Sequence, residues 1–465
     1  MRFIFRPYMS PLYSNKPIGK QRSRLGPAKV LILGYLTAML VGAGLLSLPM
    51  AQQADAQVSW LTALFTSASA VSGTGLSVVS TGTTWSPLGL VVILLLLQVA
   101  ALGFMVFSTL FFALLHKKMG LSQRMLIRQS LDLHDFHDLN TIMMHILAGA
   151  LLFQLGGGVL LMLRFVPRYG WLEGMGMAIF TAVSAFANGG FDVFSHLYPE
   201  AGFSIMSGDF FALSVIMVLT LLGGLGFFVW EDCYSNRFRF KKLQLHSKLV
   251  LLISVWLLVI PALLFYGLER TNTLAGMSLG HGWFTSLFQV IMPRSTGFSL
   301  IEQSELTGAT KMVVMMLMFV GGSGGSAAGG IRNVTAGILL LSGISYLRGK
   351  QSLVIMKKTI PLGQIKGALA IVMIAVLLTF TSSLLIAMVQ PELSFTAILF
   401  EVISAVSTSG LSYGSVADFG TVGQLVLIGL MFLGRVGIMT LAMVAFAKTD
   451  KYDKIKYPET WVILG

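Results

Sequence analysis

The sequence of 465 residues has few charged side chains and almost no cysteine. Charged residues make up 11 % of the chain, whereas soluble globular proteins carry about 25 %. Together with a mean hydropathy of +0.81, this excludes an ordinary soluble protein and a disordered chain. The single cysteine excludes a secreted domain held by internal disulfides. No nucleophile–base pair or pair of carboxylates stands out either, so we predict that the protein is not an enzyme.

Long apolar runs are abundant instead. A transmembrane helix needs about 20 apolar residues, and eight runs are on that scale: 30–50, 88–115, 141–165, 210–230, 249–268, 312–347, 371–389 and 425–447. Four shorter runs lie between them, at 60–71, 174–187, 282–292 and 395–407. The order long, short, long occurs four times, which marks a tandem repeat of one membrane unit.

The short runs cannot cross about 30 Å of hydrocarbon as helices, so we expect them to be re-entrant. The irregular backbone after them is tolerated at membrane depth where protein buries it or where it lines a watery cavity. We therefore predict an all-α polytopic membrane protein with four tandem helix–pore-loop–helix units. Eight transmembrane helices and four re-entrant pore helices would surround one pore.

The predicted divisions follow the apolar runs. Segments 1–29, 116–140, 233–248, 348–366 and 448–465 are the basic N-terminus, three linkers and the C-terminal tail, and pore units one to four are 30–115, 141–232, 249–347 and 367–447. The polar lead is too long for a signal peptide, and we expect the first apolar run to remain as a membrane helix.

Charge is distributed unevenly along this pattern. Of the 32 Lys and Arg residues, 25 lie in the N-terminal segment, the linkers and the tail, whereas acidic residues flank the short runs. Cytoplasmic loops collect Lys and Arg, so we predict that both termini are cytoplasmic and that the short runs enter from the outer side. The net charge of +13 is then a topology signal that also suits anionic lipid, and we expect no nucleic acid partner.

One glycine follows each short run at a fixed place. These glycines are Gly75, Gly190, Gly297 and Gly410, each followed by Leu or Phe, and their spacings of 115, 107 and 113 residues match the repeat. A Ser-Ala pair precedes three of the four junctions: Ser69-Ala70, Ser184-Ala185 and Ser404-Ala405. A single such glycine would be an ordinary turn glycine. Four in register favour a ring of loops around one axis.

Such a ring suits ion transport. A monovalent cation that crosses lipid must exchange its hydration shell for fixed oxygens, and backbone carbonyls can supply them. Glycine permits unusual dihedral angles and keeps side chains out of the pore. We predict that the selectivity filter consists of Thr74, Gly75, Gly189, Gly190, Thr296, Gly297, Ser409 and Gly410.

These repeats and filter glycines resemble the Trk/Ktr/HKT superfamily of potassium transporters over essentially all residues after 29. Related glycine motifs occur in the second helices of unit two, Gly223-Gly224-Leu225-Gly226, and unit four, Gly434-Arg435-Val436-Gly437. Unit one departs from them with Ala100-Ala101-Leu102-Gly103. The segment Lys456-Tyr457-Pro458-Glu459, the terminal Gly465 and the short N-terminus are similar to the KtrB-type branch.

The resemblance implies a function. It implies that the backbone carbonyls of the four filter glycines bind the transported ion. It implies K⁺ as that ion, because sodium-type relatives carry Ser where Gly75 stands. It also implies a homodimer in membrane lipid, in the bacterial inner membrane, regulated by a cytoplasmic KtrA/TrkA-like ring of nucleotide-binding subunits. Na⁺ would act as an activator, and no nucleotide would bind this chain.

Other functions remain as alternatives. The first is a sodium-permeable or Na⁺/K⁺-coupled transporter of the same fold. A membrane enzyme or an alternating-access transporter belongs to a different class, and it would show inverted repeats or acids at the midplane. Here the repeats share one orientation, and Glu401 is the one acid within a membrane segment.

A run of glycine interrupts the second helix of unit three. Six of the ten residues 321–330 are Gly, and each costs a helix about 1 kcal/mol. The resemblance implies an intramembrane gating loop, with a passive kink as the alternative, and we reject a nucleotide fingerprint because no βαβ unit surrounds it. The predicted gate residues are Gly321, Gly322, Ser323, Gly324, Gly325, Ser326, Gly329 and Gly330.

Some polar residues in apolar surroundings also need explanations. Arg435 lies deep in an apolar run, where a charge must face a cavity or a partner. We predict a cationic barrier in the inner pore, with an ion pair to Glu401 as the alternative. Asn188 would line the outer mouth or form a turn, and Arg294 would pair with an outer acid. His134 and His137, with Asp135 and Asp138, are interpreted as a solvated linker rather than a metal site.

Overall fold

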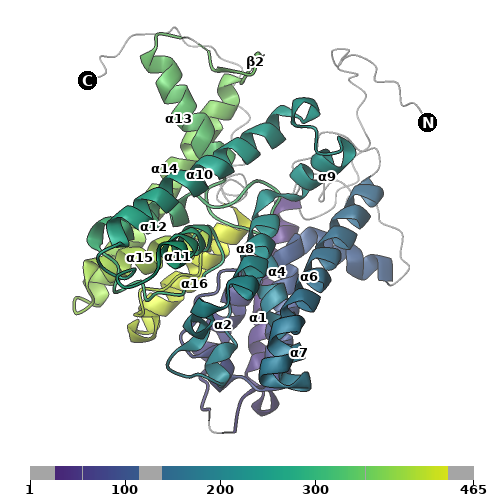
Figure 1. The fold of residues 1–465 in the computed structure, drawn as a ribbon, viewed down its shortest axis with the longest axis vertical. Coiled ribbons are helices and arrows are strands. Elements are labelled where there is room, and N and C mark those ends of the chain that lie inside the picture. Colours follow the sequence, from purple (N-terminus) through teal and green to yellow (C-terminus); the bar gives the residue numbers. More distant parts are fainter. Residues whose placement is uncertain (1–26, 55, 115–138, 351, 438–465) are drawn as a thin grey trace.

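The computed structural model describes residues 27–54, 56–114, 139–350 and 352–437 (Figure 1). This part of the chain is mostly helical, which confirms the predicted all-α class. Its strands β1 (Val354–Ile355) and β2 (Lys358–Thr359) form a hairpin between α13 and α14. The cluster around His134, the segment beginning at Lys456 and nearly all of the predicted N- and C-terminal segments lie outside the described residues.

Each repeat contributes a first helix, a pore helix and a second helix. The first helices are α1 (Pro27–Leu46), α6 (Leu139–Tyr169), α10 (Leu245–Glu269) and α14 (Leu362–Val389). The pore helices are α2 (Trp60–Ser72), α7 (Trp171–Phe186), α11 (Leu279–Ile291) and α15 (Phe395–Ser407). The second helices are α4 (Pro87–Leu114), α8 (Phe210–Leu225) with α9 (Phe227–Ser235), α12 (Gly308–Phe319) with α13 (Asn333–Leu347), and α16 (Thr421–Val436).

Short elements join these helices. They are α3 (Thr81–Thr84) and the 3₁₀ turns η1 (Pro49–Ala51), η2 (Phe194–His196), η3 (Gly202–Gly208), η4 (Phe240–Lys242) and η5 (Val416–Asp418). Several boundaries differ from the apolar runs, because the helices continue beyond them: α10 begins at Leu245, α14 begins at Leu362, and α9 continues to Ser235.

The four first helices alone, among the described residues, form single helices long and apolar enough to cross a membrane. Their outer surfaces carry large exposed apolar side chains, such as Leu152 at 68 % and Phe380 at 66 % exposure. Such surfaces are unfavourable in water and suit contact with lipid. The chain is therefore a membrane protein.

The second helices are broken. Gly103 (φ 72°, ψ 148°), Gly226 (φ 94°, ψ 139°) and Gly437 (φ 90°, ψ 128°) interrupt or end α4, α8 and α16. Only glycine readily adopts such angles, and one residue there stops the helical hydrogen-bond pattern. The sequence predicted a break in unit three alone, because the break there contains many glycines. Each of the other three breaks is made by a single glycine.

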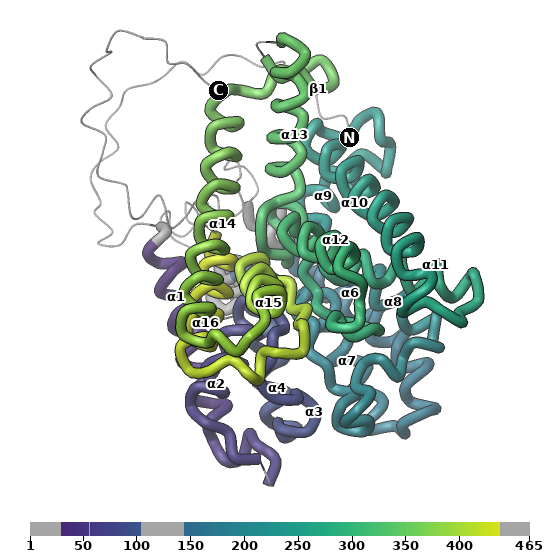
Figure 2. Tube along the Cα trace, turned by 90° about the vertical axis from the view of Figure 1, so that its left-hand side faces the viewer, coloured from purple at the N-terminus to yellow at the C-terminus, as the bar shows by residue number. Residues whose placement is uncertain are grey.

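The units close into a ring. Each second helix packs on the pore helix of the next unit: α4 on α7, α8 on α11, α12 on α15, and α16 on α2. Figure 1 shows units one and two (purple to teal) on one side and units three and four (green to yellow) on the other. In Figure 2, α13 and the adjoining end of α14 extend beyond the body of the other helices.

Candidate functional site

Three of the four pore helices start with the same kind of cap, whereas α7 follows Gly170 without a side-chain cap. Hydroxyl groups of Ser59, Ser278 and Ser394 cap α2, α11 and α15 by accepting hydrogen bonds from backbone N–H groups in the first turn. Such caps satisfy donors that a helix start leaves free. Toward their C-terminal ends the pore helices are almost wholly buried, including their hydroxyl-bearing residues.

The predicted filter glycines lie against one another in order around the ring. All four have positive φ, between 57° and 91°. A Cβ on Gly75 would lie 2.3 Å from the carbonyl oxygen of Gly189, and one on Gly190 would lie 1.7 Å from that of Thr296. A Cβ on Gly297 would lie 2.8 Å from the carbonyl carbon of Gly410.

The ring of contacts closes between units four and one. A Cβ on Gly410 would lie 1.9 Å from the carbonyl oxygen of Thr74. Real Cβ atoms do not approach backbone this closely, and an L side chain resists positive φ as well. Four loops from one chain therefore bring backbone carbonyls together around an axis where no side chain fits.

A second set of equivalent positions lies two residues before each filter glycine. Gly73, Asn188, Ser295 and Thr408 all have positive φ. Asn188, Ser295 and Thr408 each lie close to a glycine of the following second helix, at Gly223, Gly321 and Gly434 respectively. Gly73 instead lies close to Ala100. Unit one therefore has the reverse arrangement: the glycine, Gly73, is in the loop, and the residue with a methyl group, Ala100, is in the helix.

The Ser-Ala pairs have a local role that the sequence did not reveal. The Ser69 hydroxyl accepts a hydrogen bond from Gly75 N at 2.9 Å, and the Ser404 hydroxyl accepts one from Gly410 N at 3.1 Å. In unit two the Ser184 hydroxyl accepts from Phe191 N at 2.9 Å. These bonds hold the filter loops against the pore helices that precede them.

The remaining predicted filter residues are surrounded by protein. The hydroxyls of Thr74 and Ser72 lie 2.6 Å apart, and the Ser409 hydroxyl donates to the carbonyl of Pro293 at 2.7 Å. Thr296 is fully buried, and Gly189 faces Leu97 of α4. The Thr296 hydroxyl has no hydrogen-bond partner among the described residues, and the groups that neighbouring loops share at the ring are backbone carbonyls.

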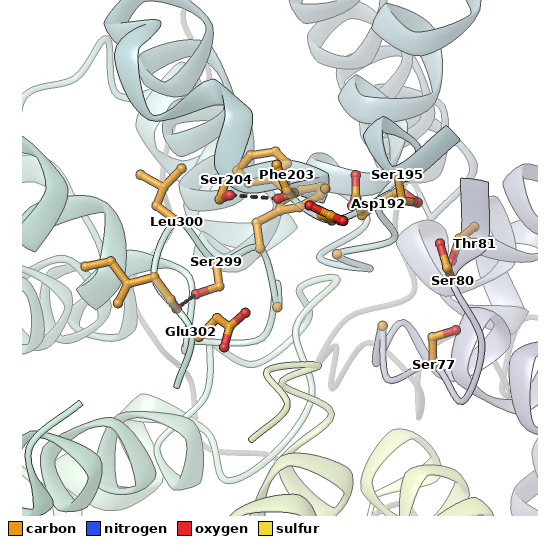
Figure 3. A pocket seen from close by; sticks show the side chains of 18 of the residues that line it. Ser77, Ser80, Thr81, Asp192, Ser195, Phe203, Ser204, Ser299, Leu300 and Glu302 are labelled. Atoms are coloured by element: carbon orange, nitrogen blue, oxygen red, sulfur yellow. Dashed lines mark hydrogen bonds between the residues drawn. The ribbon is translucent and has the colours of Figure 1, made fainter. Parts of the chain in front are cut away.

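A pocket of about 670 Å³ opens onto three of the filter glycines, Gly75, Gly190 and Gly297. The charged residues that line it are all acidic: Asp192, Glu200, Glu302 and Glu305. Figure 3 shows Asp192 and Glu302 on different segments around the pocket. Burial raises the pKa of Asp192 from 3.8 to about 6, although Phe194 N donates to its carboxylate at 2.7 Å. The mouth of the ring would thus attract cations.

The predicted gate residues form one folded loop beneath the ring. Its backbone joins the break in unit two: Ser323 N donates to Gly224 O at 2.9 Å, and Phe227 N donates to Gly325 O at 2.8 Å. A further bond, from Ala327 N to Gly223 O, is 3.0 Å long. The broken end of α8 therefore uses its free backbone groups to hold the loop.

The loop also lies under the fourth filter segment. A Cβ on Gly329 would lie 1.9 Å from Thr408 Oγ1, and one on Gly321 would lie 2.2 Å from Gly329 O. These approaches account for glycine at both positions. They also place the loop directly next to the residues that precede a filter glycine.

Two arginines hold this loop. Arg435 donates hydrogen bonds to the carbonyls of Ala327, in the loop, and Ala100, in α4. Arg332 donates to the carbonyls of Ala328 and Ser323. The alternative of an ion pair between Arg435 and Glu401 is wrong, because the Glu401 carboxylate instead accepts from Ser412 and Tyr413.

Of the two alternatives for Asn188 the turn is confirmed, since this residue lies in a turn with φ 55°, whereas the ion pair expected for Arg294 is absent among the described residues. Asn188 does not line the pocket; it is fully buried and packs against Gly223 and Gly224 of α8. Arg294 is also buried. Both residues lie in the turns that lead into the filter, where local conformation, invisible in the sequence, decides their direction.

Comparison with known proteins gives a consistent result. The model of a family described as a cation transport protein, TrkH, matches residues 37–455. The chain is 36 % identical to the Ktr system potassium uptake protein B of Bacillus subtilis, over 95 % of this chain and 97 % of that protein. It is 34 % identical to the potassium/sodium uptake protein NtpJ of Enterococcus hirae, over 96 % and 98 % respectively.

A solved structure shares the fold. The crystal structure of the potassium transporter TrkH from Vibrio parahaemolyticus superimposes with a TM-score of 0.69 at 17 % identity, covering 91 % of this chain and 85 % of that one.

Proposed function

The chain belongs to the TrkH family of cation transport proteins, and from that premise we propose that it is the pore-forming subunit of a potassium uptake system. The observation that carries the proposal is the closed ring of Gly75, Gly190, Gly297 and Gly410, all at positive φ. The backbone carbonyls of these four residues would replace the hydration shell of K⁺. Thr74, Gly189, Thr296 and Ser409 would complete the filter. The acidic pocket would supply cations to it.

We propose an orientation for this pore. The pocket faces the outside, because its charged lining is wholly acidic. The linkers and the termini, which hold most of the basic residues, face the cytoplasm. The protein would then lie in the bacterial cell membrane with its gating loop below the filter.

Regulation would act on that loop. Residues 321–330 are packed under the filter by backbone hydrogen bonds and by Arg435, which is how a closed gate would be held. The relatives named as Ktr uptake proteins suggest a partner, and we propose a cytoplasmic nucleotide-binding subunit that releases the loop. Homodimer formation and activation by Na⁺ are further parts of this proposal.

Ion uptake in a potassium-uptake-deficient bacterial strain tests the proposal. The wild-type protein is expected to take up K⁺ in preference to Na⁺, and Gly297→Ser should abolish that preference because its side chain would enter the ring. Gly280→Ser is the matched control, since a Cβ there contacts no described atom within 4 Å. Uptake without a preference for K⁺, unchanged by Gly297→Ser, would contradict the proposed function.

A further inference from the structure

Two of the four filter loops are braced from behind by a long polar side chain of their own pore helix. In unit four, Glu401 Oε1 accepts hydrogen bonds from Ser412 Oγ and Tyr413 N, both at 2.7 Å. In unit three, Gln289 Nε2 donates a hydrogen bond to Ser299 Oγ at 3.3 Å. Ser299 and Ser412 each lie two residues after a filter glycine. Both pore-helix side chains are almost completely buried.

Units one and two lack this brace. Thr66 occupies the position of Glu401 in unit one, nine residues before the filter glycine, and its hydroxyl bonds to Thr62 O in its own helix at 3.0 Å. At the positions two residues after the glycine, the Ser77 hydroxyl donates to Val79 O, and the Asp192 carboxylate accepts from Phe194 N. The brace is therefore a feature of one half of the ring.

The brace on unit four extends to unit three. Lys311 Nζ, at the start of α12, donates to the Tyr413 hydroxyl at 3.1 Å and to Ser304 O at 2.7 Å. Its ammonium group also lies 4.9 Å from the centre of the Tyr413 ring. Glu401, Tyr413 and Lys311 thus connect the loops that follow the third and fourth filter glycines.

The chemistry at Glu401 shows what the brace requires. One oxygen, Oε1, receives both hydrogen bonds, while Oε2 is buried with no hydrogen-bond partner among the described residues. An acceptor oxygen is enough to bind these two donors, and a negative charge is not required. The side-chain amide of Gln would therefore bind them equally well. In unit three the bracing side chain is the amide of Gln289, eight residues before its filter glycine, and there the amide nitrogen donates to Ser299 Oγ and Ile301 O.

We infer that Glu401 is a positioning residue that fixes the fourth filter segment, and that the preference for K⁺ over Na⁺ depends on it. This inference rests on the proposed function. A ring of carbonyls distinguishes two cations only as far as its oxygens are held in place. Backbone bonds on the pore helix fix the start of each segment, whereas Glu401 fixes its far end.

The ratio of K⁺ to Na⁺ uptake tests the inference. Glu401→Gln keeps the acceptor oxygen and is expected to retain the wild-type ratio within about twofold. Glu401→Ala removes the acceptor and should lower the ratio about tenfold, which corresponds to losing one or two buried hydrogen bonds. Thr66→Val is the matched control and should keep the wild-type ratio. A Glu401→Gln variant as unselective as Glu401→Ala would overturn the inference, since charge and not position would then matter.

A double-mutant cycle separates positioning from general damage. Ser412→Ala removes one of the two donors and should lower the ratio in the same direction as Glu401→Ala. The double variant should be no less selective than Glu401→Ala alone, because both changes break one interaction. If Glu401→Ala does not accumulate in the membrane, Ser412→Ala decides: a wild-type ratio in that variant overturns the inference.

Failure of the inference and failure of the proposed function give different results. If the wild-type protein shows no preference for K⁺, the proposed function fails. If it prefers K⁺ and loses that preference with Gly297→Ser but keeps it with a folded Glu401→Ala, only the inference fails.

Discussion

Single residues decide the shape of the filter by contact as well as by conformation. Gly190 combines positive φ with the closest approach of the four, because a Cβ on it would lie 1.7 Å from Thr296 O. A methyl group there must displace the neighbouring loop or change the backbone conformation of the loop that carries it.

We therefore expect Gly190→Ala to reduce K⁺ uptake by about tenfold to a hundredfold, on the scale of 1–3 kcal/mol for a residue forced out of its conformation. Gly176→Ala, near the start of α7, is the control, because no described atom lies within 4 Å of a Cβ there. Equal effects of the two changes on uptake, at equal abundance, would contradict the contact argument.

The pocket predicts a dependence on external pH. Folding raises the pKa of Asp192 from 3.8 to about 6, so the fold favours the protonated acid and the cation-attracting charge appears only above about pH 6. The apparent affinity for K⁺ should increase as external pH rises from 5 to 7. In Asp192→Asn this increase should disappear, whereas Glu302→Gln, in the same pocket, should retain it. Uptake kinetics at a series of pH values would measure both.

Arg435 predicts the behaviour of the closed gate. Its guanidinium joins Ala327 in the gating loop to Ala100 in α4. Arg435→Ala should remove this connection and raise the rate of uptake severalfold, and Arg435→Lys, which keeps the charge with fewer donors, should be intermediate. An unaltered rate in a variant of normal abundance would argue against a gate held at this residue.

At the scale of residues, spacing in the sequence picked out the four glycines that meet in the ring, because four repeats made them stand out. It did not find the hydroxyl bonds of Ser69, Ser184 and Ser404, although the Ser-Ala pairs were visible. Nor did it find the positive φ of Thr408. A hydrogen bond of this kind depends on how a loop folds back on its helix, and no sequence period records that.

The elements of the pore differ in how firmly they hold their shape. The first helices are long and apolar, whereas every second helix is interrupted by glycine at or before the end of its described part. In unit three the interruption is the whole gating loop, which depends on contacts to α8 and to the fourth filter segment.

Two glycines of this loop give a matched test. Gly329→Ala would press against Thr408 Oγ1 and should displace the loop, raising uptake severalfold in the absence of a regulatory partner. Gly324→Ala, where a Cβ meets no described atom within 4 Å, should behave as wild type. Identical rates in both variants would show that this contact does not hold the loop.

Helix positions were largely predictable, because apolar length and short-run spacing report them directly. The pore helix α15 begins and ends where its apolar run does. The breaks at Gly103, Gly226 and Gly437 were missed, since a lone glycine in a membrane helix is common and only its φ reveals a break.

The molecule as a whole is polarised in charge, and this predicts its orientation. Cys233 is the one cysteine, so Cys233→Ser gives a cysteine-free background. A cysteine placed at Lys241 should react with a membrane-impermeant reagent only from the cytoplasmic side, and one at Glu200, in the pocket, only from outside. Labelling of both from the same side would contradict the proposed orientation.

The closed ring of four loops lies within one polypeptide. In an assembly of four identical chains, one codon change alters every quarter of the pore at once. Here each quarter is encoded separately, so selection can adjust ion preference one loop at a time while the other three keep the pore working. The unequal bracing of the two halves is a difference that such a gene can accumulate and a symmetric tetramer cannot.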